Sequence, residues 1–293
     1  RIGTDGDLKK AAQLIQDLDG KIDCFGLGGI DLYIQVGNRR YYFREGTKLG
    51  SYAKKTPIVD GSGLKNTLER RVVYHMRDRL GIELEGAKVF LVSAADRFGM
   101  AEALMDCGAK TIYGDLMFAV GLPIPLHRLQ TVDALARPVA PLICKLPFSL
   151  VYPTGSKQEV NNGRCRYGRY YQWADVIAGD WHFIKKHLPQ DLAGKVVLTN
   201  TVTPADVQLL KQRGAQCLVT TTPNLGGRSF GTNVMEAVLV ALAGKRPEEL
   251  QVSDYEYWLD QMGFEPRVEW FSEGQPLDDM MEKVDAVEKR VYN

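Results

Sequence analysis

The segment Asp60-Gly-Ser-Gly-Leu-Lys65 carries a carboxylate and an ammonium group around a tight glycine-rich turn. It follows a short apolar run, residues 56–59, and opens a long helical pattern. A carboxylate beside an ammonium group can accept and return the proton of a substrate hydroxyl, as hydride transfer requires. The alternative is structural, because an aspartate at this position can also cap the helix that follows. The sequence leaves both interpretations open.

A second candidate is the turn Ser93-Ala-Ala-Asp-Arg-Phe-Gly99, between an expected strand and an expected helix. Such a turn can receive a pyrophosphate through backbone N–H groups, and Asp115, about 20 residues on, can hold a ribose diol. The Gly-x-Gly-x-x-Gly fingerprint is absent, Asp96 would repel a pyrophosphate and Arg97 would attract one. A dinucleotide site and a plain connection are therefore equally compatible with this turn. The expected cofactor contacts are Ala94, Arg97, Phe98, Gly99 and Asp115.

Polar residues also follow later apolar runs. Thr199-Asn200 ends one expected strand, and the glycine-rich loop 220–233, which contains Arg228 and Thr232, follows another. Ligands bind at the carboxyl edge of open α/β sheets, so these strand ends are expected to meet there with Asn66. The sequence thus predicts a site for a small anionic substrate at this edge. The loop is equally compatible with ordinary connecting chain.

Composition limits the classes of function. The chain has 293 residues, of which 45% are hydrophobic and 25% charged, as is ordinary for a globular protein. Its net charge of +1 does not indicate a protein that binds nucleic acid. Five cysteines form no Cys-x-x-Cys or Cys/His cluster, so we expect reduced thiols in a cytoplasmic protein without a metal site. No signal peptide and no apolar run long enough to span a bilayer is apparent, so no membrane partner is expected.

The elements that must position these residues alternate between strand and helix. Continuous apolar strands separated by helices predict an α/β fold, a Rossmann-like doubly wound parallel sheet preceded by a smaller α/β domain. We expect the first domain at residues 1–80, the second at 81–275 and a charged tail at 276–293. The expected strands are 23–34, 41–43, 56–59, 88–94, 110–113, 175–178, 195–199 and 216–221. The expected helices are 8–18, 64–80, 100–107, 181–188, 204–213, 232–243 and 254–261.

One proline-rich segment, residues 121–168, interrupts this alternation. It is too long for a simple loop in a compact domain. We expect an inserted helical excursion packed on the second domain or on a second subunit, which allows a homodimer. A membrane-surface helix is disfavoured, because Pro138, Pro141 and Pro147 break a continuous amphipathic face.

The order of pieces resembles the shikimate and quinate dehydrogenase family, including a bacterial group labelled quinate 5-dehydrogenase. The resemblance covers residues 56–115 and 174–247 loosely. It rests on Asp60-Gly-Ser-Gly63 before a helix, Leu84–Val92, Cys107-Gly-Ala109, Thr203–Ala215, Phe230–Ala237 and Ala243–Pro247.

The family pattern assigns roles to particular residues of this chain. It implies that Asp60 is the catalytic aspartate and that Glu236 stands where the family usually has a substrate-binding glutamine. The family's lysine motif, Asn-Val-Thr-x-Pro-x-Lys, has no counterpart here, so Lys48 and Lys65 are candidates for the catalytic lysine by proximity in sequence.

The leading hypothesis is an NAD(P)-dependent oxidoreductase that acts on a small hydroxylated carboxylic acid. Asp60 with Lys65 or Lys48 would manage the hydroxyl proton, and NAD is favoured over NADP because Asp115 would repel a 2′-phosphate. Substrate would be bound by Asn66, Thr199, Asn200, Thr232 and Glu236. The alternative is a non-redox protein of the same ancestry that binds or transforms another small anionic ligand, since the dinucleotide fingerprint is missing.

Overall fold

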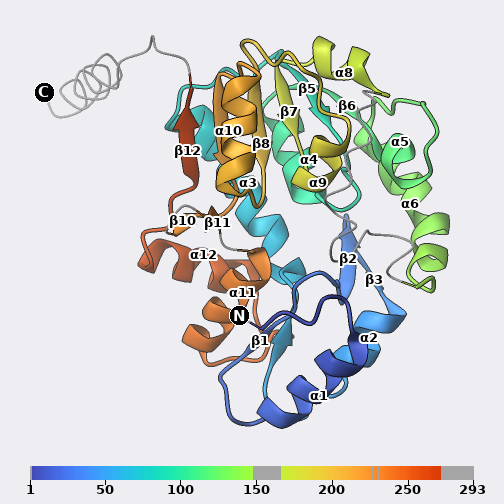
Figure 1. The fold of residues 1–293 in the computed structure, drawn as a ribbon, viewed down its shortest axis with the longest axis vertical. Coiled ribbons are helices and arrows are strands. Elements are labelled where there is room, and N and C mark those ends of the chain that lie inside the picture. Colours follow the sequence, from blue (N-terminus) through green and yellow to red (C-terminus); the bar gives the residue numbers. More distant parts are fainter. Residues whose placement is uncertain (1, 148–165, 226–227, 230, 272–293) are drawn as a thin grey trace, which may run out of the picture.

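A computed structural model describes residues 2–147, 166–225, 228–229 and 231–271 (Figure 1). Its centre is a six-stranded sheet in the order β12-β9-β8-β7-β5-β6. Neighbours from β6 to β9 pair in parallel, and β12 pairs antiparallel to β9 at the edge. The strands are β5 (Lys88–Leu91), β6 (Lys110–Tyr113), β7 (Val176–Ala178), β8 (Val196–Thr199), β9 (Cys217–Thr220) and β12 (Arg267–Trp270).

Helices cover both faces of this sheet. Successive residues of a strand point to opposite faces, and the strands are apolar at successive positions, so both faces must be shielded from water. Val89 and Leu91 of β5 pack in one core cluster and Phe90 in another. The first cluster includes side chains of α3 (Ser62–Asp78), α4 (Phe98–Asp106), α11 (Thr232–Ala243) and α12 (Val252–Gln261). The second includes side chains of α5 (Asp115–Ala119), α8 (Gly168–Trp173), α9 (Trp181–Lys186) and α10 (Pro204–Gln212). The expected mixed α/β class and mostly parallel sheet are confirmed.

The order of the parallel strands reverses between β5 and β7, since β6 lies on one side of β5 and the later strands lie on the other. This reversal is the switch point at which open α/β sheets bind ligands, outside the carboxyl ends of the strands. The chain turns that leave β5 and β7 therefore mark the place where a site is expected.

Residues 2–60 form a smaller unit, drawn in blue in the lower half of Figure 1, below the large sheet. Its elements are α1 (Leu8–Leu18), β1 (Phe25–Gly26), β2 (Tyr33–Val36), β3 (Arg39–Tyr42), α2 (Arg44–Gly50) and β4 (Ile58–Val59). β1 pairs in parallel with β4, and β2 pairs antiparallel with β3. Helix α3 begins directly after β4 and packs on α4 and α11, so it connects this unit to the large sheet.

Residues 23–34 are expected as a strand broken by Gly26, Gly28 and Gly29, and the structure has two separate strands there, β1 and β2, which belong to different sheets. Gly29, with φ +80°, lies between them in a backbone region that favours glycine, so the chain bends there.

The proline-rich segment contains a helix, as expected, but Pro138 and Pro141 do not interrupt it. Helix α6 (Leu129–Ile143) continues through Pro138 and Pro141, although each lacks the N–H of an interior helical hydrogen bond. Burial of Leu129, Val132 and Ala140 holds the helix in place. Residues 148–165 of the expected excursion and the expected tail 276–293 lie outside the described residues. No helix among the described residues has both the length and the apolar character needed to cross a membrane.

Short β10 (Asn224–Leu225) and β11 (Arg228–Ser229) form a hairpin in the expected glycine-rich loop. Residues 226–227 and 230 of that loop are outside the described part, so the expectation that Arg228 attracts an anionic ligand stays a prediction.

Candidate functional site

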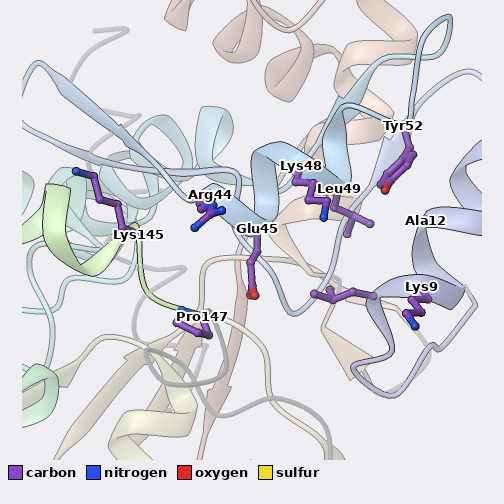
Figure 2. A pocket seen from close by; sticks show the side chains of 10 residues that line it. Lys9, Ala12, Arg44, Glu45, Lys48, Leu49, Tyr52, Lys145 and Pro147 are labelled. Atoms are coloured by element: carbon purple, nitrogen blue, oxygen red, sulfur yellow. The ribbon is translucent and has the colours of Figure 1, made fainter.

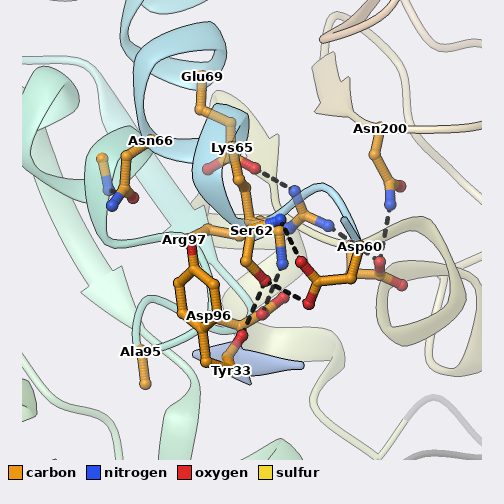
Figure 3. A network of polar contacts seen from close by, with 12 residues as sticks. Tyr33, Asp60, Ser62, Lys65, Asn66, Glu69, Ala95, Asp96, Arg97 and Asn200 are labelled. Carbon is orange, nitrogen blue, oxygen red and sulfur yellow. Dashed lines mark hydrogen bonds and ion pairs between the residues drawn. The ribbon is translucent and has the colours of Figure 1, made fainter. Parts of the chain in front are cut away.

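Charged and polar side chains from six segments gather at the carboxyl edge of the large sheet. Figure 3 shows six of them: Asp60, Lys65, Glu69, Asp96, Arg97 and Asn200. They come from the loop after β1, the end of β4, helix α3, the turn after β5, and the chain that leaves β7 and β8. We call this group the charged cluster. It consists of Asp31, Asp60, Lys65, Glu69, Asp96, Arg97, Asp180 and Asn200.

Lys65 lies in the first turns of α3, and its Nζ binds Oδ1 of Asp96 at 2.8 Å. The two side chains keep 15% and 8% of their exposure, so this pair reaches solvent. Burial lowers the pKa of Lys65, but the nearby carboxylates of Asp96 and Asp31 outweigh it and raise the pKa overall. Lys65 is therefore a fixed positive charge rather than a base.

Arg97 links helix α3 to the chain that follows β7 through two ion pairs. Its guanidinium pairs with Glu69 and, through Nη2, with Oδ2 of Asp180 at 3.0 Å. Only 3% of the Arg97 side chain is exposed, so both ion pairs are largely shielded from water. Asn200 extends the network, because its Nδ2 donates to Oδ2 of Asp180 at 2.8 Å. This arrangement fixes the edge of the sheet against the connecting helix.

Asp31 is the carboxyl group of the cluster that is best suited to proton exchange. Burial and the neighbouring carboxylates Asp96, Asp60 and Asp180 raise its pKa to about 7, although the positive charge of Lys65 lowers it. Within the described part of the chain, no group donates a hydrogen bond to this carboxyl. A carboxyl that titrates near neutral pH and has free lone pairs can act as a general base.

Asp60 is not the N-cap of α3, which is Gly61, but it has another structural role. Its carboxylate accepts hydrogen bonds from the backbone N–H of Leu32 at 2.5 Å and of Ser62 at 3.0 Å, and from Oγ of Ser62 at 2.8 Å. It therefore ties the loop before β2 to the start of α3. Asp60 and Lys65 share the cluster, but the ion pair of Lys65 is with Asp96.

The turn after β5 is internally bonded. The N–H groups of Ala94 and Ala95 donate to Asp115 at 3.1 and 2.8 Å, and the N–H of Gly99 donates to Oδ1 of Asn66 at 3.0 Å. Phe98 is 6% exposed and packs in the core. The predicted cofactor contacts Ala94, Arg97, Phe98, Gly99 and Asp115 are thus brought together, but the chain itself satisfies them.

Glu236 lies beneath the start of α3 rather than in the charged cluster. Its Oε2 accepts from the N–H of Gly61 at 2.6 Å, and its Oε1 lies 3.0 Å from the hydroxyl of Tyr255. Burial and the charge of Asp60 raise the pKa of Glu236 to about 8. Gly61 has φ +98°, and a Cβ there would lie 3.0–3.1 Å from atoms of Thr232. Both predicted residues, Glu236 and Thr232, therefore pack on the turn that follows Asp60.

Two other predicted residues lie elsewhere. Lys48, on α2, lines a surface pocket with Lys9, Arg44 and Lys145, and no member of the charged cluster lines that pocket (Figure 2). Its proposed partnership with Asp60 is therefore corrected: proximity in sequence did not place it at the cluster. Thr199 is fully buried, and its hydroxyl donates to the carbonyl of Gly179 at 2.8 Å, so it braces β8 against β7.

The sequence interpretation missed Asp31, Glu69 and Asp180 as site residues. Asp180 follows an apolar strand run, a signal that was present, whereas Asp31 follows a glycine-rich stretch in which no strand end was expected. Within the residues that the structure describes, no three side chains of the metal-binding types His, Cys, Asp and Glu are placed to hold a metal ion. Lys65 and Arg97 stand between the carboxylates of the cluster.

Comparison with solved structures gives remote likenesses. An NAD-dependent malic enzyme from Thermotoga maritima is 13% identical, with a TM-score of 0.30 over 76% of this chain and 55% of its own length. A protein described as a malic enzyme (malate oxidoreductase) is 13% identical, with a TM-score of 0.31 over 87% of this chain and 69% of its own. A protein from Mycobacterium smegmatis is 12% identical, with a TM-score of 0.31 over 98% and 87%.

At these TM-scores the likenesses carry no argument about activity. The chain spans about half the length of the Thermotoga enzyme, 55% of it. No curated protein matches the sequence. The chain belongs to the family described as a domain of unknown function, DUF8754, whose model matches residues 63–271. A second model, also described as a domain of unknown function, DUF8753, matches residues 1–60.

Proposed function

We propose that the charged cluster binds a small hydroxylated molecule and exchanges a proton with it, with Asp31 as the base. The observation that carries this proposal is the Lys65–Asp96 ion pair, which keeps partial exposure at the switch point of the sheet. The charges of both partners act on the Asp31 carboxyl, whose pKa is raised to about 7. Lys65 would orient a hydroxyl oxygen of the ligand, and the ionised Asp31 would accept a hydrogen bond from that hydroxyl. Asp60 would keep the Asp31 loop in place through Leu32.

The balance of charge narrows the ligand class. The cluster holds five carboxyl groups, those of Asp31, Asp60, Glu69, Asp96 and Asp180, against the two cations Lys65 and Arg97. An acidic surrounding disfavours an anion and favours groups that donate hydrogen bonds. The ligand proposed here is therefore a neutral polyol or an amino alcohol, in place of the small anion expected from the sequence.

The oxidation of a hydroxy acid with NAD(P), expected from the resemblance to shikimate and quinate dehydrogenases, is the competing proposal. The doubly wound parallel sheet supports it, because dinucleotides bind at the switch point of such sheets. The turn after β5 fits a pyrophosphate poorly, because the N–H groups of Ala94, Ala95 and Gly99 are engaged by Asp115 and Asn66 and the turn carries the Asp96 carboxylate. The proton transfer is therefore proposed without any step through a dinucleotide.

Thermal stability can test the proposal directly. A panel of polyols, amino alcohols and hydroxy acids would be titrated against the wild type and the variants Asp31→Asn, Lys65→Met and Lys48→Met. We expect at least one polyol or amino alcohol to raise Tm of the wild type and of Lys48→Met, but not of Asp31→Asn or Lys65→Met. A shift of equal size in all four proteins would contradict a site at the charged cluster.

A further inference from the structure

The turn that leaves β5 holds an anion supplied by the chain itself. Oδ2 of Asp115 accepts from the N–H of Ala94 at 3.1 Å, and Oδ1 accepts from the N–H of Ala95 at 2.8 Å. Two adjacent backbone N–H groups aimed at one carboxylate form the kind of concavity that binds phosphate in dinucleotide folds. We infer that Asp115 is a built-in anion that occupies this turn and excludes a pyrophosphate from it.

The backbone is shaped to bring Asp115 to the turn. The N–H of Gly114 donates to the carbonyl of Leu91 at 2.8 Å, which continues the β5–β6 pairing to the residue before Asp115. A Cβ on Gly114 would lie 2.8 Å from the carbonyl oxygen of Val92, so only glycine allows this approach. The pairing of β5 with β6 thus fixes the backbone next to Asp115 and places its carboxylate at the turn.

The rest of the turn offers little to an incoming diphosphate. The N–H of Gly99 is bound by Asn66, and the N–H of Arg97 donates to the carbonyl of Ala94 at 3.0 Å. The guanidinium of Arg97 is held by Glu69 and Asp180. The remaining charged side chain of the turn is Asp96, whose carboxylate would repel phosphate.

Asp115 is ionised under ordinary conditions. Burial raises the pKa of its carboxyl to about 6, while the N–H groups of Ala95 and Ala94 act in the opposite direction. At pH 7.5 the carboxylate form therefore dominates and the turn is occupied by negative charge. The negative charge of Asp115 therefore selects against ligands that would place a phosphate group in this turn. This holds whichever ligand the charged cluster binds.

Anion rescue tests this role. Asp115→Gly removes the carboxylate and leaves a gap, and Asp115→Asn keeps the shape without the charge. Asp133→Asn is the matched control, because Asp133 of α6 is also partly buried and lies outside the turn. Tm would be measured at pH 7.5 with sodium formate, sodium pyrophosphate or NADH, each against sodium chloride of equal ionic strength.

We expect formate and pyrophosphate to raise Tm of Asp115→Gly by several degrees and to leave the wild type and Asp133→Asn unchanged. Stabilisation of the wild type by pyrophosphate or NADH beyond the effect of chloride would overturn the inference. So would a folded Asp115→Gly that does not respond to formate. If Asp115→Gly does not fold, Asp115→Asn decides: a Tm equal to that of the wild type would overturn the inference, and a clearly lower Tm than Asp133→Asn would support it. None of these readouts depends on the ligand of the charged cluster.

Discussion

Arg97 shows how strongly single residues determine the state of the charged cluster. It is the buried cation between Glu69 and Asp180, and 3% of its side chain is exposed. Removing one partner of a buried ion pair leaves the other charge without compensation, which costs about 3–5 kcal/mol. Arg97 therefore stabilises the fold by compensating the buried charges of Glu69 and Asp180.

The substitution Arg97→Met is therefore expected to lower the free energy of unfolding by about 3–5 kcal/mol, as measured by urea denaturation. Arg137→Met is the matched control, because Arg137 pairs with Asp133 on the surface of α6 and is 52% exposed. An exposed pair contributes about 0–1 kcal/mol. Equal losses in the two variants would show that Arg97 is not the buried link described here.

Part of the site could be predicted from single residues, and part could not. Asp60, Lys65, Asn66 and Asn200 were selected because they lie at strand ends or helix starts, and the structure brings them to one edge of the sheet. Asp31 could not be selected in this way. Its importance comes from a pKa that depends on four neighbours distant in sequence, and no local pattern encodes their meeting.

At the scale of elements, the critical join is the tight turn between β4 and α3. Gly61 has φ +98°, and a Cβ there would lie 2.8 Å from the backbone nitrogen of Asn233 at the start of α11. The turn is thus constrained by its own conformation and by a neighbouring helix. Because the turn carries Asp60 on one side and Lys65 on the other, its geometry sets the geometry of the cluster.

Gly61→Ala should therefore destabilise the protein more than an alanine at an unconstrained glycine. Gly194→Ala is the control, since Gly194 has φ +71° but no atom within 4 Å of an added Cβ. The control is expected to lose about 1 kcal/mol from backbone strain alone, and Gly61→Ala clearly more, because the helix must also move. Chemical denaturation of both variants checks this, and equal losses would refute close packing at Gly61.

Sequence patterns predicted the long elements better than the short ones. Helices α1, α3, α11 and α12 and the central strands were expected within a few residues, because their apolar spacing is regular. β12 was not expected, since an edge strand with the sequence Arg-Val-Glu-Trp has too few apolar residues to be recognised. The bend between β1 and β2 depends on tertiary pairing with β4 and β3, which local spacing does not contain.

At the scale of the whole molecule, carboxyl groups outside the ion pairs of Arg97 keep their protons to higher pH than usual. Burial raises the pKa of Glu236 to about 8 and of Asp115 to about 6. In each case the folded pKa lies above the unfolded value. The folded state therefore holds protons that the unfolded state has already released, and the free energy of unfolding falls as pH rises between these values.

We expect the stability of the wild type to decrease between about pH 5 and pH 8, the window set by the ordinary pKa of a glutamate, 4.5, and the raised pKa of Glu236, about 8. Glu236→Gln mimics the protonated acid: its amide oxygen can accept from Gly61 and its amide nitrogen can donate to Tyr255. The variant should lose part of this pH dependence in urea denaturation from pH 5 to pH 9. An unchanged slope would mean that Glu236 is ionised in the folded protein.

The order of strands in the large sheet was not predictable from the chain alone. Alternating strands and helices predicted a parallel sheet, but nothing local specifies that β6 and β7 flank β5 on opposite sides. That order creates the switch point at which the charged cluster lies. The fold class could therefore be anticipated, while the edge that carries the site became visible only with the tertiary structure.

The central claim is that Asp31 exchanges a proton near neutral pH beside Lys65, and the most direct test is a carboxyl ¹³C NMR titration of the wild type and of Lys65→Met. We predict that Asp31 titrates with a pKa of about 7 in the wild type, and at a higher pH in Lys65→Met because the nearby positive charge is lost. A wild-type pKa near 4 that does not change in Lys65→Met would contradict the account.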